Sequence, residues 1–491
     1  QRSWAYAAPT NFKALCTANL SDPLIADGST AFDTKLWTGN GGTQAITGYN
    51  FSPDFVWIKQ RNSSSQWHWV TDVVRGVKET IFPNDTYQEN TEALGLSAFN
   101  SDGYSLGSAN GINASSGSYV GWAWDAGDNS NKTYAVTVSN PGSGNKFYAD
   151  GALQPTLTLA EGSTYKFDQS SGTNSTHPLR FSTTSDGTHG GGSEYTTGVT
   201  TSGTPGSAGA YTQIVIAASA PTLYAYCTAH SGMGFQINTS DTAGYTIPVG
   251  SVSSGVPSIS SRIQANPSTG FSIVSYTATS STGTIAHGLN AAPAFVLCKK
   301  RNSTGSWWAG HVGAGWTKGA YLQVTDAFAA LSGFWNNTAP DNNVVSLGSY
   351  PTEGSPSATY VAYCFAPVEG YSAMGTYLGN GSSPPFVFTG FRPRFVMVKC
   401  INDSYLAHWF IWDSARSPYN FVSDEAALAA NVSDAEGISN WNGNGPGDQA
   451  FDILSNGFKI RMAGTAGFND NGDTYLYYAV AEHPFKTARA R

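Results

Sequence analysis

The chain has 491 residues, a formal net charge of −8 and a charged fraction of only 12%. Nucleic-acid binding needs clustered Lys and Arg, so this acidic balance argues against a nucleic-acid partner, and no run of about 18 apolar residues is present for insertion into a membrane. Gly, aromatic, Ser, Thr and Asn residues take the place of the Glu-, Lys-, Leu- and Ala-rich runs of long helices. The composition therefore predicts an all-β chain of several domains.

Along the chain, one unit is written three times. Its core reads Pro-x-Phe-Val-x-x-Lys, and each copy ends in a Tyr-centred segment, SYVGWAW, TYVAYCF or TYLYYAV. The alternation in these segments predicts strands buried on one face, and the length of the unit predicts tandem β-sandwiches with jelly-roll-like topology, each with its own core. We place the three sandwiches at residues 35–127, 271–370 and 371–491. The second and third copies have little linker between them, so the alternative that they pack as one larger sandwich stays open.

Three further segments flank or separate these sandwiches. Residues 1–34 form an N-terminal arm whose opening, QRSWAYAAPTNFKALCTANL, resembles the end of a SPRY-like sandwich, so we expect more protein before Gln1. Residues 132–240 form a separate domain, with strands such as TYAVTVSN and TLYAYCTAH and a Gly/Ser/Thr-rich loop between them. Residues 241–270 are expected to be an interdomain linker or a packed extended arm.

A set of metal-ligand residues lies in the domain at 132–240. Cys227, His230 and Met233 share the short segment YCTAHSGM, and His177 precedes them in STHPLRF. A thiolate, imidazoles and a thioether are the ligands of a blue-copper site. With HPLRF, the domain resembles a cupredoxin, a Greek-key sandwich, over about 110 residues. The resemblance implies that His177, Cys227, His230 and Met233 converge, either around copper or as an empty site retained by a structural module; we expect copper to be optional and no cofactor to be required.

Cysteines and tryptophans have a simpler interpretation. Five Cys without regular spacing do not form a disulfide framework, and comparison between repeats predicts that Cys298 and Cys364 are buried thiols. Trp residues recur at the same position of each repeat, which favours a shared role in core or interdomain packing over stacking on a glycan. The candidate glycan contacts are Trp67, Trp69, Trp307, Trp308, Trp409 and Trp412.

The repeats, in TGNGGTQAITGYNFSPDFVWIKQRN and FNSDGYSLGS, and the block LTLAEGSTYKFDQSSGTNSTHPLRFSTTSDGTHGGG resemble virion structural proteins of marine tailed phages. The resemblance implies a tail fibre or other surface appendage of the virion that contacts the host surface. No nucleophile elbow, P-loop or zinc-protease motif is present, so we expect a non-enzymatic protein that assembles with its own copies and with other virion proteins. Two alternatives remain, a bacterial cell-surface adhesin and a copper-binding electron-transfer protein.

Overall fold

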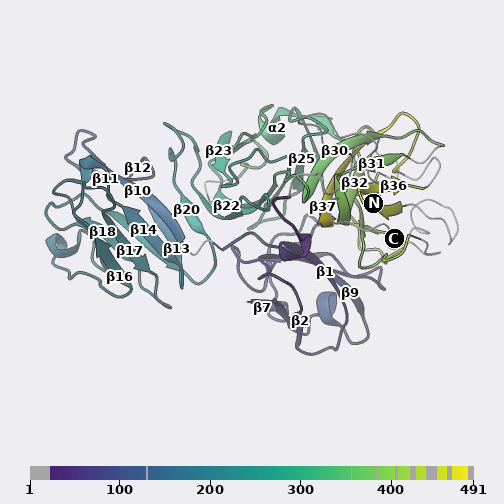
Figure 1. Cartoon of the computed structure of the whole chain (residues 1–491), viewed down its shortest axis with the longest axis horizontal. Helices are drawn as coiled ribbons and strands as arrows, with labels where there is room; N and C mark the ends of the chain where they lie inside the picture. Colours follow the sequence, from purple (N-terminus) through teal and green to yellow (C-terminus); the bar gives the residue numbers. More distant parts are fainter. Residues whose placement is uncertain are drawn as a thin grey trace, which may run out of the picture.

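The computed structural model describes residues 23–128, 131–354, 357–382, 385–403, 407–420, 427–437, 451–461 and 467–484. Strands dominate these residues, and the two α-helices, α1 (Asn110–Asn113) and α2 (Ser332–Trp335), have four residues each. The predicted all-β fold is confirmed. Figure 1 shows the inserted domain at one end and the three repeats packed together in a larger body. None of the described helices has the length and apolar character needed to cross a membrane.

Repeat 1 is a sandwich of two antiparallel sheets, with a short hairpin beside them. The larger sheet has the order β1-β9-β3-β4 and the smaller one the order β2-β8-β7. The strands are β1 (Phe32–Thr38), β2 (Gln44–Thr47), β3 (Phe55–Gln60), β4 (Trp69–Asp72), β5 (Glu79–Thr80), β6 (Asn90–Thr91), β7 (Leu96–Asn100), β8 (Gly103–Leu106) and β9 (Ser118–Trp124). Because β1 pairs with β9 from Phe32 onward, this repeat begins inside the range that the sequence assigned to the N-terminal arm.

Repeats 2 and 3 have the same plan. In repeat 2 the large sheet is β20-β21-β22-β29-β24-β25-β26-β27 and the small one β23-β28; in repeat 3 they are β30-β37-β32-β33-β34 and β31-β36-β35. The strands of repeat 2 are β20 (Tyr245–Ile247), β21 (Ser261–Asn266), β22 (Phe271–Thr277), β23 (Gly283–Ala286), β24 (Phe295–Lys300), β25 (Trp307–His311), β26 (Lys318–Tyr321), β27 (Ala329–Ala330), β28 (Val344–Leu347) and β29 (Thr359–Phe365). Those of repeat 3 are β30 (Ser372–Leu378), β31 (Phe386–Phe388), β32 (Phe391–Cys400), β33 (Phe410–Asp413), β34 (Leu428–Ala429), β35 (Phe451–Leu454), β36 (Gly457–Ile460) and β37 (Thr474–Pro484).

The repeated sequence motif occupies one position in all three copies. Its Phe-Val-x-x-Lys part lies in β3, β24 and β32, each between the Tyr-centred strand and the strand that follows the polar loop. Residues 241–270 are not only a linker, because β20 and β21 extend the large sheet of repeat 2 at its edge.

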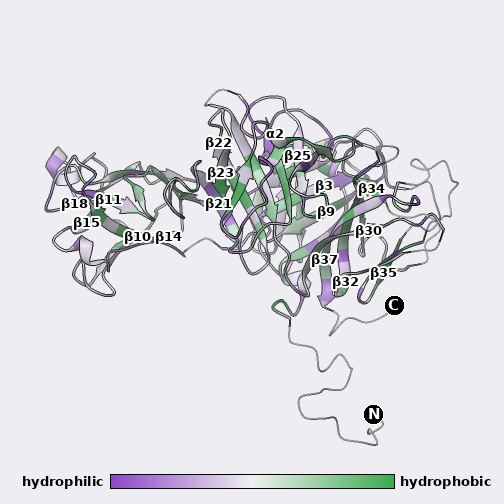
Figure 2. Ribbon diagram, turned by 90° about the horizontal axis from the view of Figure 1, so that it is seen from above, coloured by the Kyte–Doolittle hydropathy of each residue, from purple (hydrophilic) through white to green (hydrophobic). Residues whose placement is uncertain are grey.

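The central strands are buried on both faces, which corrects the expectation of one buried face. All six residues of β3 are buried. Val56 and Ile58 point into the core of repeat 1, whereas Phe55 and Trp57 belong to a larger core that also contains side chains of repeats 2 and 3. The prediction of wholly separate cores is therefore wrong. Figure 2 shows the apolar strands gathered inside the body of the molecule.

The repeats contact one another in a closed ring. In each copy, one residue lies beside the motif lysine across the sheet, and a ring nitrogen of this residue contacts a main-chain oxygen of the next copy. The residue that carries this oxygen has the same position in all three copies. These contacts are Trp307 Nε1 to Phe82 O (2.8 Å), Trp409 Nε1 to Tyr321 O (3.2 Å) and His68 Nε2 to Ala429 O (3.1 Å). Such head-to-tail interfaces close after three steps.

The motif lysines strengthen the same ring. Each is buried, and each donates a hydrogen bond of 2.9 Å to the main-chain oxygen four residues beyond the position just described. The pairs are Lys299 with Thr86, Lys399 with Thr325 and Lys59 with Ser433. Burial lowers the pKa of Lys299 to about 7 and those of Lys59 and Lys399 to about 8. Equivalent contacts at all three joints make the repeats one body.

The inserted domain is a mixed β-sandwich with its own core. One sheet has the order β12-β11-β10-β14-β17-β16 and the other β13-β19-β18-β15, and two neighbouring pairs, β10 with β14 and β13 with β19, are parallel. The strands are β10 (Asn131–Ser139), β11 (Lys146–Ala149), β12 (Ala152–Leu153), β13 (Leu157–Ala160), β14 (Thr164–Asp168), β15 (Leu179–Ser182), β16 (Val199–Ser202), β17 (Tyr211–Val215), β18 (Leu223–Cys227) and β19 (Phe235–Ser240).

Candidate metal centre

The candidate ligands meet at one end of the inserted sandwich because of the pairing of β15 with β18. Leu179, near the start of β15, lies opposite Cys227, the last residue of β18. His177 lies two residues before Leu179, the first residue of β15, and His230 follows β18 in a tight turn. Along β18, Leu223, Ala225 and Cys227 are buried, as period-two alternation requires. The thiol therefore points into the domain at the place where the two histidines arrive.

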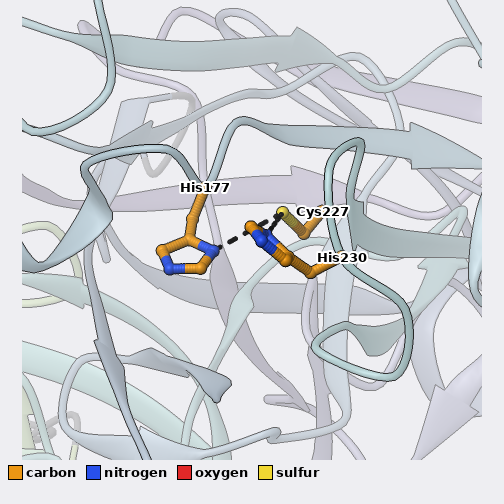
Figure 3. A group of neighbouring side chains, drawn as sticks. All are labelled: His177, Cys227 and His230. Atoms are coloured by element: carbon orange, nitrogen blue, oxygen red, sulfur yellow. Dashed lines mark hydrogen bonds between the residues drawn. The ribbon is translucent and has the colours of Figure 1, made fainter.

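The distances fit a metal ion between the three side chains. Cys227 Sγ lies 3.8 Å from His177 Nδ1 and 3.7 Å from His230 Nδ1, and the three candidate ligand atoms lie within 4.8 Å of one another (Figure 3). Metal–sulfur and metal–nitrogen bonds of about 2.3 and 2.0 Å at about 120° put sulfur and nitrogen roughly 3.7 Å apart. The two sulfur–nitrogen distances are therefore those of a metal ion bound by Cys227 together with His177 and His230.

Met233 and the burial of the ligands agree with this arrangement. Cys227 and Met233 are buried in the domain core, His177 is 7% exposed, and His230 is exposed. Only one ligand therefore lies at the solvent edge. The structure brings His177, Cys227 and His230 together, and it places Met233 in the core that the thiol enters.

Protonation of the ligands opposes metal binding at low pH. Burial, with a contribution from His230, lowers the pKa of His177, which favours the neutral imidazole that binds metals. Burial raises the pKa of the Cys227 thiol, while the main-chain N–H groups of Ala229 and His230 lower it. Because the thiolate is the ligand, metal binding must release a proton, and affinity rises with pH.

The turn that carries His230 is held by a segment that sequence reasoning treated only as a loop. Asp186 accepts hydrogen bonds from Ser231 Oγ (2.5 Å) and from the main-chain N–H of Gly232 (2.8 Å). The following 3₁₀ turn, η4 (Gly187–Gly190), places His189 Nε2 3.0 Å from the main-chain oxygen of Cys227. A Cβ at Gly187 would lie 2.4 Å from the ring of Tyr226, so this approach requires glycine.

His177 also has an outer partner. Its Nε2 lies 3.4 Å from the side-chain amide of Asn145, so Nδ1 remains directed at Cys227. Metal-bound histidines donate their second ring N–H to a neighbouring acceptor. Metal binding at Nδ1 would therefore be favoured with the amide oxygen of Asn145 turned toward Nε2.

The tryptophan positions divide into two groups. The rings of Trp307, Trp308, Trp409 and Trp412 are buried, so these four cannot stack on a sugar, which corrects their interpretation as glycan contacts. They fill the cores within and between repeats. Trp69 is half-buried. Trp67 is 37% exposed and packs on Phe82, with ring centroids 5.0 Å apart.

Fold and site together define an all-β protein in which three sandwich repeats form a ring and an inserted sandwich carries a metal-ligand cluster. The chain belongs to the family described as Domain of unknown function (DUF7483), whose profile matches residues 27–147 and 238–484. The intervening residues 148–237 contain all four candidate ligands, so the metal cluster lies outside the matched family sequence. No curated protein and no solved structure matches the chain.

Proposed function

We propose that this chain is a non-enzymatic structural protein of a tailed-phage virion, displayed on its surface as part of a tail fibre or another appendage. The observation that carries the proposal is the ring of three repeats, in which equivalent buried contacts recur at every joint. Head-to-tail interfaces that close into a ring give a body of fixed shape. An appendage that withstands force or contacts a host needs such a body. The resemblance of the repeats to virion proteins supplies the location.

Localisation in the particle tests this role. Proteomic analysis of purified virions should find the chain at a fixed copy number, and antibodies against the body should label the appendages. Cross-linking within the particle should join copies of the chain to one another and to other virion proteins. Recovery of the protein only from bacterial cell envelopes would contradict the virion assignment and favour the adhesin.

We further propose that the inserted domain binds one copper ion without requiring it for folding. The observation behind this proposal is the 3.7 and 3.8 Å spacing of one thiol and two imidazoles at one end of the sandwich. His177, Cys227 and His230 would hold the ion, and Met233, which lies in the same core as Cys227, would offer a thioether as a further ligand. Bound copper would supply one-electron redox chemistry, which is the basis of the alternative electron-transfer function.

Titration with Cu(II) tests the copper proposal. The purified chain should develop an intense visible thiolate-to-copper absorption that saturates at one ion per chain. Cys227→Ser should abolish this absorption, whereas Cys364→Ala, which alters a buried thiol in repeat 2, should retain it. Absence of the absorption in the native chain would contradict a type 1 site. Reversible reduction at a single potential would be needed before an electron-transfer function is considered.

We also propose that Trp67 contacts sugars on the host surface. Trp67 exposes part of its ring beside Tyr87, which is itself 46% exposed, at a centroid separation of 6.3 Å. Exposed aromatic rings offer apolar faces for pyranose rings. Trp67→Ala should weaken binding to host-surface glycan without changing the unfolding free energy by more than about 1 kcal/mol.

A further inference from the structure

A groove lies where the inserted domain meets repeat 2. It has a volume of about 690 Å³ and is lined by residues of β13 in the inserted domain and of β20, β21 and β22 in repeat 2. Ten of its fifteen lining residues are Ser or Thr, among them Thr158, Ser260, Thr277 and Thr359. Hydroxyl groups donate and accept hydrogen bonds, so this lining suits a ligand that itself carries many hydroxyls.

One cation lines this hydroxyl-rich groove. Arg262 of β21 uses Nη1 and Nη2 to bind the side chain and main-chain oxygen of Thr242, the former at 2.7 Å. A guanidinium has five N–H donors, so three remain after these two bonds. Its buried Nε has no partner among the described residues, and none of the ion pairs that those residues form includes Arg262.

The charge of Arg262 is poorly compensated by its surroundings. Burial lowers its pKa to about 10; Tyr165 and Asp241 oppose this effect, and Arg301 adds to it. Arg301 itself is neutralised by Glu89, at 2.7 Å, whereas no carboxylate of the described residues forms an ion pair with Arg262. An anion in the groove would therefore stabilise this guanidinium more than it would stabilise an arginine that already has a carboxylate partner.

We propose that the groove binds an acidic saccharide, whose sulfate or carboxylate group pairs with Arg262 while its hydroxyls bond the Ser and Thr side chains. The inference rests on the host-surface contact of the proposed function and deepens it, by naming a ligand class and a place separate from Trp67. The net charge of the chain is −8, so recognition depends on short-range contacts in the groove and not on attraction by the whole molecule.

Calorimetric titration of the full chain with four probes tests this proposal. The three oligosaccharide probes have the same length. The probes are a chondroitin sulfate hexasaccharide, its desulfated form, the neutral hexa-N-acetylchitohexaose and inorganic sulfate. At least one acidic hexasaccharide should bind at one site per chain, and the neutral one should bind at least about tenfold more weakly. The two acidic probes separate a sulfate from a carboxylate as the recognised group.

Three variants locate the binding. Arg262→Gln should lower affinity for the acidic hexasaccharide about tenfold or more, and Thr277→Tyr, at an exposed position, should block the groove while retaining Arg262. Lys318→Gln removes the same charge from an exposed position of repeat 2 and should bind normally. Thermal melting of each variant separates loss of binding from loss of folding.

Several results would overturn the inference. They are no binding of either acidic hexasaccharide by the native chain, equal binding of the neutral probe, binding of inorganic sulfate with no gain from the sugar, and unchanged affinity in Thr277→Tyr. The chain could fail each of these tests and still be located in the virion, because proteomics and labelling of particles measure that role separately.

Discussion

Replacement of Asp72 by alanine should destabilise the whole body, because this carboxylate joins two repeats. Asp72 is fully buried, and its Oδ2 accepts from Arg75 Nε at 2.5 Å and from the Tyr363 hydroxyl of repeat 2 at 2.7 Å. Its Oδ1 accepts from the main-chain N–H groups of Val74 and Arg75. Asp72→Ala removes all four acceptor contacts and leaves a buried guanidinium with fewer partners.

The expected loss follows from these contacts. Breaking a buried ion pair by removing one partner costs about 3–5 kcal/mol. Arg75 retains a contact of 3.0 Å with Glu89, so we expect the lower end, about 3 kcal/mol, or roughly a hundredfold in the unfolding equilibrium constant. Tyr363→Phe removes one hydrogen bond to a charged group and should cost about 1.5–3 kcal/mol.

Urea unfolding followed by tryptophan fluorescence measures these losses. The control is Lys35→Ala in repeat 1, which breaks the more exposed pair of Lys35 and Asp33, at 2.7 Å, while Arg394 still pairs with Asp33, and it should cost about 0–1 kcal/mol. Fluorescence from the body should report one transition, since the joints couple the repeats. A loss for Asp72→Ala no larger than that for Lys35→Ala, or separate unfolding of repeat 1, would refute the reasoning.

Three further predictions concern the metal turn, pH and the thiols. Asp186→Asn removes one acceptor from the turn that carries His230, so copper affinity should fall about tenfold with little change in stability; unchanged affinity would contradict this role. Burial lowers the pKa of His287 and His311 to about 4, so the folded state favours the neutral imidazoles. As the pH falls from about 6.5 toward 4, the free energy of unfolding should therefore decrease by about 3 kcal/mol for each histidine. A constant urea midpoint from pH 7 to 4 would refute this. Cys298 and Cys364 are buried with raised thiol pKa values, so mass spectrometry should find them alkylated by iodoacetamide only after unfolding, and rapid labelling of the native chain would count against their burial.

The strand positions could be predicted from the sequence, but the ring could not. The repeated Phe-Val-x-x-Lys pattern marks equivalent strands because apolar residues and turns recur at the same spacing. Phe55 of β3 contacts Phe271 and Tyr363, which lie more than two hundred positions away, and no local pattern contains that information. One signal was available: the run FVWI of β3 is apolar at every position, which is typical of strands buried on both faces.

The candidate site was likewise predictable only in part. Cys227 and His230 follow from their spacing, and His177 follows from the resemblance to cupredoxins, because two paired strands bring these segments together. Asp186 and His189 were missed because they lie in a Gly/Ser/Thr-rich stretch without periodicity. Their roles arise from a 3₁₀ turn that folds against a segment about forty residues later.

The joint between the inserted domain and repeat 2 was missed for a related reason. Residues 241–270 contain many Ser, Pro and Gly, a composition typical of linkers. Thr246 of β20 nevertheless bonds Thr158 of the inserted domain while β20 pairs with β21 of repeat 2. A strand of three residues is too short for period-two alternation to reveal, so the groove beside it has no signature in the sequence.

The most direct measurement of the metal site is a crystal structure of the copper-loaded chain, with anomalous diffraction recorded on both sides of the copper absorption edge. We expect a single anomalous peak in the inserted domain, among the side chains of His177, Cys227, His230 and Met233. A peak at any other place, or the absence of a peak among these residues in the copper-loaded protein, would contradict the proposed copper centre.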